Sequence, residues 1–240
     1  MPLRGRQFAR AAFFHQLFND WLEIAPGRVV NRPGLMASNV SKPFQAQIIM
    51  SCGFRTPPTL VTNDPEQVRD FHARHGRIVY KSISSVRSIV TEWMPGNKTD
   101  LQKVRVLPTQ FQAYIGGTNI RVHVIGEAVF ATSIASEAVD YRYAGRQGQD
   151  ANLEPTALPA DIEDKCRKLT ARLGLAFAGI DLKRTADEEW YCFEVNTSPG
   201  YSYFQEQTGQ PIADSLAAYL AGADKENIGS VRGAADGPGH

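Results

Sequence analysis

Two short apolar segments separated by a polar turn constrain the fold of this chain more than any other feature. The segments are Gly179–Leu182 and Phe193–Asn196, and each is typical of a β-strand. If they pair as a hairpin about the turn, Asp181 lies opposite Glu194. Asn196 then points the same way as Glu194, because residues i and i+2 of a strand share a face. The pattern predicts two carboxylates and one amide oxygen that converge on one point.

Carboxylates this close repel each other, and a hard divalent cation such as Mg²⁺, held by oxygen ligands, is the simplest remedy. A structural alternative stays open, because acidic residues at strand ends often only face water. The third oxygen at Asn196 and the tight turn 198–200 favour a metal site. Asp181, Glu194 and Asn196 are therefore predicted metal ligands, and a phosphate-handling enzyme is the leading class. A register slip of one residue would turn Asp181 away.

Length and charge limit the classes of protein. A chain of 240 residues can form one large domain or two small ones. Its net charge of +1 gives no global field that points to nucleic acid or to an anionic membrane, so we expect neither as a partner. No apolar run approaches the ~20 residues needed to span a bilayer, and no signal-peptide segment opens the chain, so we expect a cytoplasmic protein. Three scattered cysteines are expected to be buried in a reducing compartment.

The order of elements predicts an α/β (α+β) fold. Apolar periodicity with start and stop residues predicts helices at about 7–22, 41–53, 63–76, 162–174 and 211–221. Besides the hairpin, strands are predicted at 59–62, 78–81, 111–115, 121–125 and 128–133. A strand, a helix and a strand in quick succession form an α/β unit. Residues 141–149 are predicted to form a polar loop, and the tail from 224 to be disordered.

Three basic residues are candidates for phosphate contacts. Lys81 ends an apolar strand, where it can either reach solvent or project its ammonium onto a nucleotide phosphate. Arg121 lies between Ile120 and Val122 on a strand that is expected to be buried, so it needs an anionic partner. That partner could be a structural carboxylate or a transferred phosphoryl group. Arg142 lies in the polar loop, where a surface salt bridge is the alternative.

Other site classes find no support. The five histidines lack metal-ligand spacing, and no Walker-type or dinucleotide glycine pattern occurs. No serine lies in a nucleophile-elbow setting. Basic residues do not alternate with aromatic ones in a nucleic-acid-binding pattern.

These pieces, in this order, resemble the ATP-grasp superfamily, most closely the RimK-like carboxylate–amine ligases and the related ligases that cross-link ribosomal peptides. The resemblance covers roughly 31–221, and its most specific part is AGIDL at 178–182 followed by FEVNTSPG at 193–200. It implies an ATP-grasp fold, in which two α/β subdomains grip a nucleotide. Such proteins usually begin with a Rossmann-like domain, which here is expected to be missing, reduced or supplied by a partner.

The resemblance also implies a division of the chain. We expect an N-terminal remnant or linker at 1–40 and a small subdomain at 41–110. A large subdomain is expected at 111–223 and a disordered tail at 224–240.

The resemblance implies ATP and Mg²⁺ as cofactors and assigns residues to them. Asp181, Glu194 and Asn196 would hold the Mg²⁺ ions that bridge the ATP phosphates. Two residues are assigned catalytic roles, Arg121 at the reacting γ-phosphate and Lys81 at the phosphates.

The other assignments concern the rest of the nucleotide. Lys42 matches an earlier lysine near it, Asn119 falls near ribose or phosphate, and Arg142 falls where an arginine meets nucleotide or substrate anions. The linker whose backbone hydrogen-bonds adenine resembles Gln112, Ala113, Tyr114 and Ile115. Ala113 and Asn119 replace acidic residues that are common at those positions, and a serine-containing segment at 82–88 replaces a glycine-rich lid.

The expected activity is a ligase reaction on an amino acid or a peptide. ATP would convert a carboxylate to an acyl phosphate, and an amine or a hydroxyl would then expel phosphate, with Tyr201, Ser202 and Tyr203 lining the acceptor pocket. The chain could work as a homo-oligomer or with a separate N-terminal-domain partner. A different Mg²⁺-dependent phosphotransferase and a non-catalytic nucleotide-binding module are the alternatives.

Overall fold

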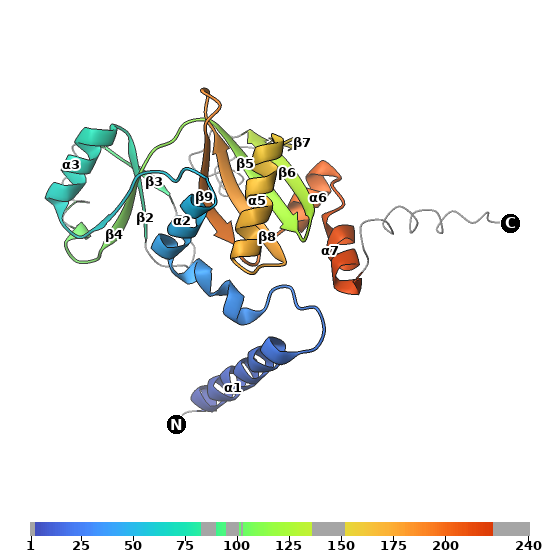
Figure 1. The fold of residues 1–240 in the computed structure, drawn as a ribbon. Helices are drawn as coiled ribbons and strands as arrows, with labels where there is room; N and C mark the ends of the chain where they lie inside the picture. Colours follow the sequence, from blue (N-terminus) through green and yellow to red (C-terminus); the bar gives the residue numbers. More distant parts are fainter. Residues whose placement is uncertain (1–2, 83–89, 95–100, 102, 136–151, 223–240) are drawn as a thin grey trace.

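The computed structural model describes residues 3–82, 90–94, 101, 103–135 and 152–222. Its strands form two antiparallel sheets that lie side by side (Figure 1). The four-stranded sheet has the order β1 (Thr59–Thr62), β4 (Thr109–Ala113), β2 (Ile78–Ser82), β3 (Thr91–Trp93). The five-stranded sheet has the order β7 (Asn152–Thr156), β6 (Ala128–Ala135), β5 (Thr118–Ile125), β8 (Phe177–Arg184), β9 (Trp190–Asn196). The predicted mixed α and β architecture is confirmed.

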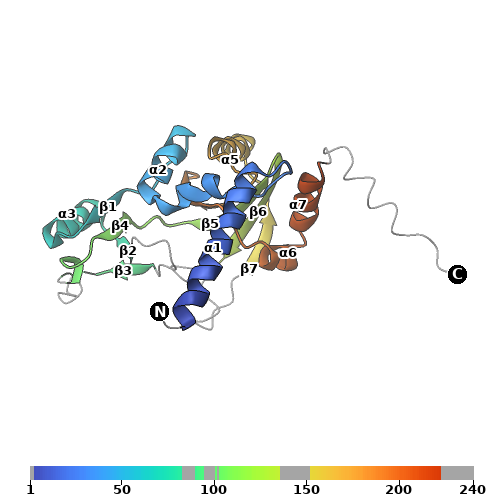
Figure 2. The same ribbon diagram turned by 90° about the horizontal axis from the view of Figure 1, so that it is seen from below.

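Helices α2 (Lys42–Ser51) and α5 (Ala160–Arg172) cover one face of the five-stranded sheet (Figure 2). The predicted apolar stripe of α5 faces the sheet, and Cys166 and Leu169 are fully buried there. The main core lies between these helices and the strands, because alternate residues of β5, β8 and β9 point into it. All three cysteines are free and buried, as predicted. Burial raises the pKa of the Cys166 thiol to about 12, so it stays protonated and inert.

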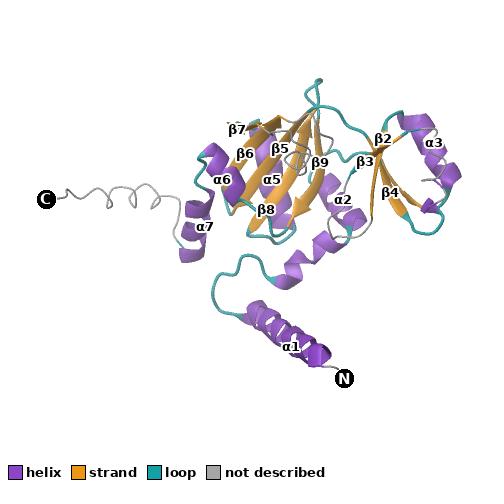
Figure 3. Cartoon of the chain, turned by 180° about the vertical axis from the view of Figure 1, so that it is seen from behind, coloured by secondary structure: helices purple, strands orange, loops and turns teal. Residues whose placement is uncertain are grey.

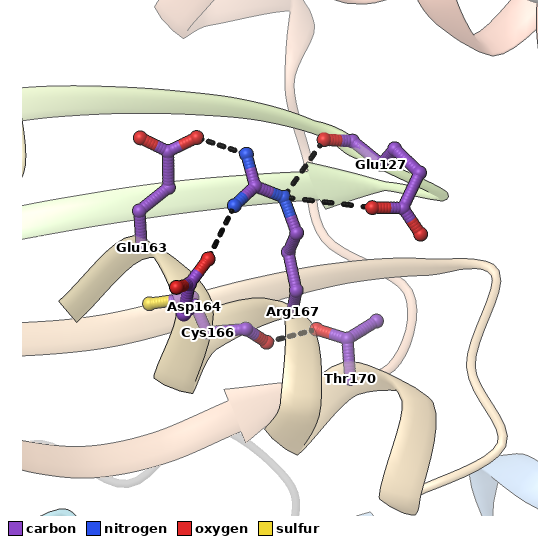
Figure 4. Close-up of polar contacts among 6 residues, drawn as sticks. All are labelled: Glu127, Glu163, Asp164, Cys166, Arg167 and Thr170. Atoms are coloured by element: carbon purple, nitrogen blue, oxygen red, sulfur yellow. Dashed lines mark hydrogen bonds and ion pairs between the residues drawn. The ribbon is translucent and has the colours of Figure 1, made fainter. Parts of the chain in front are cut away.

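Arg167 ties the outer side of α5 to the β5–β6 turn (Figure 4). Its Nε donates to the carbonyl oxygen of Glu127 at 3.0 Å, and its Nη1 donates to Asp164 Oδ1 at 3.0 Å. Its Nη2 contacts the carboxylate of Glu163, one turn away on the same helix. The guanidinium therefore fixes α5 against the β5–β6 turn.

Helix α3 (Pro65–His75) covers the four-stranded sheet and packs Val68 and Phe71 on Ile78 of β2. Asp64 caps the helix by accepting from the Glu66 N–H at 2.9 Å, as its sequence predicts. The strand predicted at 111–115 lies two residues earlier. The expected subdomain boundary at 110/111 therefore falls inside β4, and α2, from the segment 41–110, packs on the five-stranded sheet.

The short linker 114–117 joins the two sheets. Gly117 has a φ of +127°, and a Cβ there would collide with the carbonyl of Arg184. Only glycine fits this point, where the linker crosses the end of β8. The position of the linker against the large sheet is therefore set by backbone packing.

Helix α1 (Leu3–Ile24) projects away from both sheets and is followed by the 3₁₀ helix η1 (Pro33–Val40) (Figures 1 and 2). Arg32 caps the C-terminus of α1, because its Nη1 donates to the carbonyls of Leu22 and Glu23 at 2.6 and 2.8 Å. Several large apolar side chains of α1 are more than half exposed: Phe8, Phe13, Phe14, Leu17, Phe18, Trp21 and Ile24. Among the described helices, none combines the length and the apolar character that crossing a membrane requires.

Helices α6 (Ser202–Thr208) and α7 (Ile212–Ala221) follow the hairpin and pack at one end of the five-stranded sheet (Figure 3). Phe204 and Ile212 join Phe177 in a second buried cluster. The sequence pattern predicted α7 but neither α6 nor the strands β3 and β7. Helix α6 spans only two turns, which is too short for a periodic signal.

Candidate active site

The hairpin β8–β9 has the predicted register. Asp181 lies directly opposite Glu194, and Asn196 shares their face of the sheet, opposite Gly179. Asn196 Nδ2 donates to Asp181 Oδ2 at 3.1 Å. The two carboxylates and the amide group therefore lie together, as predicted, on the face that α5 does not cover (Figure 3), but the amide atom that contacts Asp181 is the nitrogen, whereas the sequence predicted the oxygen. We call this face of the five-stranded sheet the polar face.

A β-bulge shapes the hairpin beside these residues. The register shifts between Asp181 and Leu182, so that Leu182 pairs with Cys192 and Phe193 is the extra residue. In a regular strand, Cys192 and Glu194 would share a face. The bulge lets Cys192 enter the core, where it is fully buried, while Glu194 stays on the polar face. The sequence pattern gave no sign of this irregularity.

Arg121 pairs with Asp181 across the neighbouring strands β5 and β8. Its Nε lies 2.9 Å from Asp181 Oδ1, and its side chain is 8% exposed. The guanidinium also lies over the Phe204 ring, 5.6 Å from the centroid. The buried arginine thus has the anionic partner that its sequence setting demanded. Arg121, Asp181 and Glu194 form a line across β5, β8 and β9, which we call the charged row.

Lys42 provides the cation at the other end of the charged row. Its Nζ lies 2.9 Å from Glu194 Oε2, and the two side chains are 22% and 15% exposed. Lys42 begins α2, and Gln45 holds that helix against the edge strand β9. The Gln45 side chain accepts from the Val195 N–H at 2.9 Å and donates to the Val195 carbonyl at 2.8 Å. These two hydrogen bonds to the edge strand keep Lys42 beside Glu194.

The residues present fit a magnesium ion. Asp181, Glu194 and Asn196 offer hard oxygen donors on one face, which is the chemistry that Mg²⁺ prefers. Their two negative charges are balanced by Arg121 and Lys42, cations of the kind that bind phosphate. In the described part of the chain, no three His, Cys, Asp or Glu side chains gather as metal ligands, so the candidate set is two carboxylates and an amide.

Gly179 and His123 close one end of the site. A Cβ at Gly179 would lie 2.5 Å from Pro199 Cβ and 2.7 Å from Arg121 Nη1, so glycine lets the guanidinium and the turn meet. His123 is fully buried between the rings of Phe177 and Phe204. Its Nε2 lies 3.3 Å from the Gly200 carbonyl, which requires the proton on that nitrogen.

The imidazole of His123 is held neutral by its surroundings. Burial, assisted by the charge of Arg121, lowers the pKa of His123 to about 4, although the Gly200 carbonyl opposes the shift. The side chain therefore acts as a neutral donor that fixes the turn after β9.

The remaining predicted residues are divided between the two sheets. Lys81 lies on β2 of the four-stranded sheet, paired with Gln110 and half-buried. Asn119 lies on the polar face, opposite Lys183 of β8. The structure thus brings Lys42, Arg121 and the three predicted metal ligands together, whereas Lys81 is on the other sheet.

The expected adenine linker is fixed by backbone bonds. The N–H of Ala113 donates to the Pro58 carbonyl and that of Tyr114 to the Arg77 carbonyl, both at 2.9 Å. Gln112 Nε2 donates to Thr59 Oγ1 at 3.0 Å. Outside the described residues lie Arg142, residues 83–88 of the segment expected in place of the lid, and the tail from 224.

Sequence reasoning missed three residues of this region: Gln45, Gly179 and Lys183. Lys183 could have been found, because it shares the Asp181 face at i+2. Gln45 and Gly179 act through tertiary contacts that no local pattern predicts.

A separate hollow of about 340 Å³ is lined in part by Arg28, Asn31, Leu35 and Tyr219, and by none of the predicted site residues. The Asn31 amide donates to the carbonyls of Phe177 and Thr197 and accepts from the N–H groups of Ala176 and Phe177. Its role is therefore structural.

Comparison with known proteins agrees with the fold. Residues 41–220 match the family model of the RimK-like ATP-grasp domain. The chain belongs to this family, as the sequence resemblance predicted.

Two curated relatives share this likeness. A probable alpha-L-glutamate ligase from Shewanella loihica is 22% identical over 214 residues, covering 85% of this chain and 70% of the relative. A protein of the same name from Alkalilimnicola ehrlichii is 26% identical over 200 residues, covering 78% of this chain and 65% of the relative. The matched part thus spans about two thirds of each relative.

Solved structures of peptide-modifying ligases are also similar. A RiPP-associated ATP-grasp ligase from Chryseobacterium gregarium, in complex with ADP and a leader and core peptide, is 25% identical with a TM-score of 0.80, covering 89% of this chain and 69% of that chain. The ATP-grasp ligase PsnB, complexed with a variant of its minimal precursor, Mg and ADP, is 28% identical with a TM-score of 0.73, covering 85% of this chain and 67% of that chain.

Proposed function

We propose that this chain is an ATP- and Mg²⁺-dependent ligase that joins a carboxylate to an amine or a hydroxyl, with a peptide or an amino acid as substrate. The observation that carries this proposal is the charged row. Asp181 and Glu194 face each other on one sheet face, and each has a cation of the chain at 2.9 Å. Such an alternation of carboxylates and cations suits a metal–triphosphate complex.

Asp181, Glu194 and Asn196 are the residues that would hold Mg²⁺. The ion would neutralise charge on the β- and γ-phosphates of ATP. Asn196 Nδ2 donates to Asp181, which holds the amide beside the carboxylates, and Oδ1 is the atom that would bind the ion. The Mg and ADP present in the PsnB complex support this assignment.

The cations would receive the phosphates. Arg121 is buried beside Asp181, where a preorganised guanidinium stabilises the charge that develops on a transferring phosphoryl group. Lys42 and Lys81 would neutralise the rest of the triphosphate. Asn119 and Arg142 would contact ribose, phosphate or substrate anions.

The nucleobase would lie between the two sheets, which act as the two subdomains. The backbone of the linker would hydrogen-bond adenine. The residues proposed for this contact are Gln112, Ala113, Tyr114 and Ile115.

The reaction consists of two displacements. A substrate carboxylate oxygen attacks the γ-phosphorus, and ADP leaves with the electron pair of the broken P–O bond. An amine nitrogen or a hydroxyl oxygen then attacks the carbonyl carbon of the acyl phosphate, loses its proton, and phosphate leaves. Positioning and charge stabilisation suffice for both steps, so no protein nucleophile is needed.

A peptide is the favoured substrate class. Tyr201 and Tyr203 follow the turn that His123 holds, and Tyr203 is 52% exposed. With Ser202 they offer aromatic and hydroxyl groups just after the turn that follows β9. The peptides bound to the similar ligases support this class.

The exposed apolar side chains of α1 support the proposal that this helix packs against a partner. A second copy of the chain and a separate N-terminal domain both fit such a surface. Light scattering at two protein concentrations tests the first, which predicts a mass that doubles as concentration rises.

The test of the proposed function is mass spectrometry of candidate peptides after incubation with the protein, Mg²⁺ and ATP. Peptides that carry both a carboxylate and a lysine, serine or threonine should lose one water when an amide or ester forms, and ADP should appear in equal amount. The variant Glu194→Gln is the matched control and should leave the peptide unchanged. A phosphorylated peptide, or ATP binding without turnover on any acceptor, would contradict the ligase assignment.

A further inference from the structure

Lys183 is a buried lysine on the polar face that none of the roles above uses. It lies two residues after Asp181 on β8, and therefore on the same side of the sheet. The residue is 9% exposed. A charge in such a place costs free energy unless a partner offsets it.

Among the described residues, the contacts of Lys183 leave its charge without an anion. Its Nζ donates to the Ile115 carbonyl at 3.0 Å. The rings of Tyr114 and Phe193 lie 5.5 and 5.6 Å from Nζ and offer their π faces. Within the described residues, no carboxylate lies at ion-pair distance from Lys183. An ammonium has three N–H donors, and the carbonyl takes one of them.

A tether to Ile115 does not by itself require a charge. A neutral donor could hold that carbonyl without the cost of burying an ammonium. A buried cation with one carbonyl and two rings is suited to an anion that arrives with a ligand, because that anion takes the remaining donors. The rings and the carbonyl then fix where the ammonium stands.

The position of Lys183 indicates which anion this is. Lys183 lies opposite Asn119, and this pair is two residues along the strands from the Arg121–Asp181 pair of the charged row. On its other side it touches the linker at Ile115. Lys183 is thus placed between the proposed adenine linker and the proposed site of the outer phosphates. The group of a nucleotide that lies between its base and its outer phosphates is the α-phosphate with its ribose.

We propose that Lys183 binds the α-phosphate of the nucleotide. The inference rests on the proposed function, because it takes the nucleotide to lie between the linker and the charged row. It adds to the site a cation that anchors the nucleotide and takes no part in phosphoryl transfer.

The test compares Lys183→Met, which keeps the length of the side chain, with Lys183→Arg, which keeps the charge. The affinities of AMP, ADP and adenosine are measured without Mg²⁺ by competition against a fluorescent ADP, so that weak binding is still quantified. In Lys183→Met, AMP and ADP should bind about tenfold to a hundredfold more weakly, whereas adenosine should change by less than about twofold. Lys183→Arg should retain most of the AMP and ADP affinity. Melting temperatures of both variants verify folding.

Two results would overturn the inference. If adenosine loses as much affinity as AMP in Lys183→Met, the lysine acts on the linker and does not bind phosphate. If AMP and ADP bind that variant as they bind the wild type, the lysine has no part in the site. A wild-type protein that binds no nucleotide would instead refute the proposed function itself.

Discussion

The two faces of the five-stranded sheet are built from the same strands and have opposite chemistry. On the α5 side, Val122 and Ile180 are fully buried in an apolar core. On the polar face, their neighbours Arg121 and Asp181 pair at 2.9 Å. Strand alternation alone produces this division, because successive side chains point to opposite faces. We therefore expect substitutions on the apolar face to change stability, and those on the polar face to change chemistry.

Arg121 provides the strongest test of the polar face. We expect Arg121→Ala to lower turnover by about 10²–10³-fold, because a preorganised cation at a developing charge is lost. ATP affinity should fall much less, and Arg121→Lys should recover only part of the turnover because it loses the guanidinium geometry. Steady-state kinetics together with ATP titration measure both effects, with the exposed Arg172→Ala as the control. Equal losses in ATP affinity and turnover would contradict a role in the transition state.

Leu169 provides the corresponding test of the apolar face. This side chain of α5 is fully buried, so Leu169→Ala should lower the free energy of unfolding by about 2–5 kcal/mol. The KM for ATP of the folded enzyme should not change, because the cavity lies on the far side of the sheet. Denaturant unfolding measures the loss, and exposed Lys168→Ala on the same helix should have almost none. A change in KM without a loss of stability would show that the two faces are not separable.

His123, on the polar face, makes the free energy of unfolding depend on pH. Its pKa falls from 6.5 in the unfolded chain to about 4 in the fold, so between these values only the unfolded state binds the proton. Its stabilising contribution is therefore full above pH 6.5 and is lost progressively as pH falls toward 4, by roughly 3 kcal/mol in total. Unfolding free energies of wild type and His123→Phe at several pH values isolate this term. Equal pH slopes for the two proteins would refute it.

Gly179 tests how closely the turn and the arginine must meet. In Gly179→Ala the new Cβ would crowd Pro199 and Arg121, so stability should fall by about 1–3 kcal/mol and turnover should fall with it. Gly27→Ala is the control, because a Cβ there meets nothing within 4 Å. Thermal unfolding and ADP release measure the two effects. A fully active Gly179→Ala enzyme would show that the guanidinium has room to move.

Much of this arrangement was predictable from the sequence, because it rests on local chemistry. The polar turn at 185–189 fixes the hairpin register, and register fixes that Asp181 faces Glu194. Arg121 was predicted to need an anion because it sits in an apolar strand, and its partner is Asp181. The family resemblance also predicted the ATP-grasp fold, and the matching domain model confirms this prediction.

The features that the sequence did not predict depend on contacts between distant segments. The bulge at Phe193 exists because Cys192 is drawn into the core, which a strand pattern does not reveal. Gln45 bonds to the edge of β9 across 150 positions of sequence. The apolar periodicity at 7–22 correctly predicted the helix α1, yet its large apolar side chains, Phe14, Phe18 and Trp21 among them, are exposed, because periodicity does not show what covers an apolar face.

The most direct test of the metal assignment is ATP titration by calorimetry with and without Mg²⁺, in wild type and in Glu194→Gln. We expect Mg²⁺ to strengthen ATP binding to the wild type, and we expect the substitution to reduce this Mg²⁺-dependent gain by about tenfold or more while the fold is kept. An ATP affinity that does not respond to Mg²⁺, or that responds equally in both proteins, would contradict the claim that Asp181, Glu194 and Asn196 hold the ion.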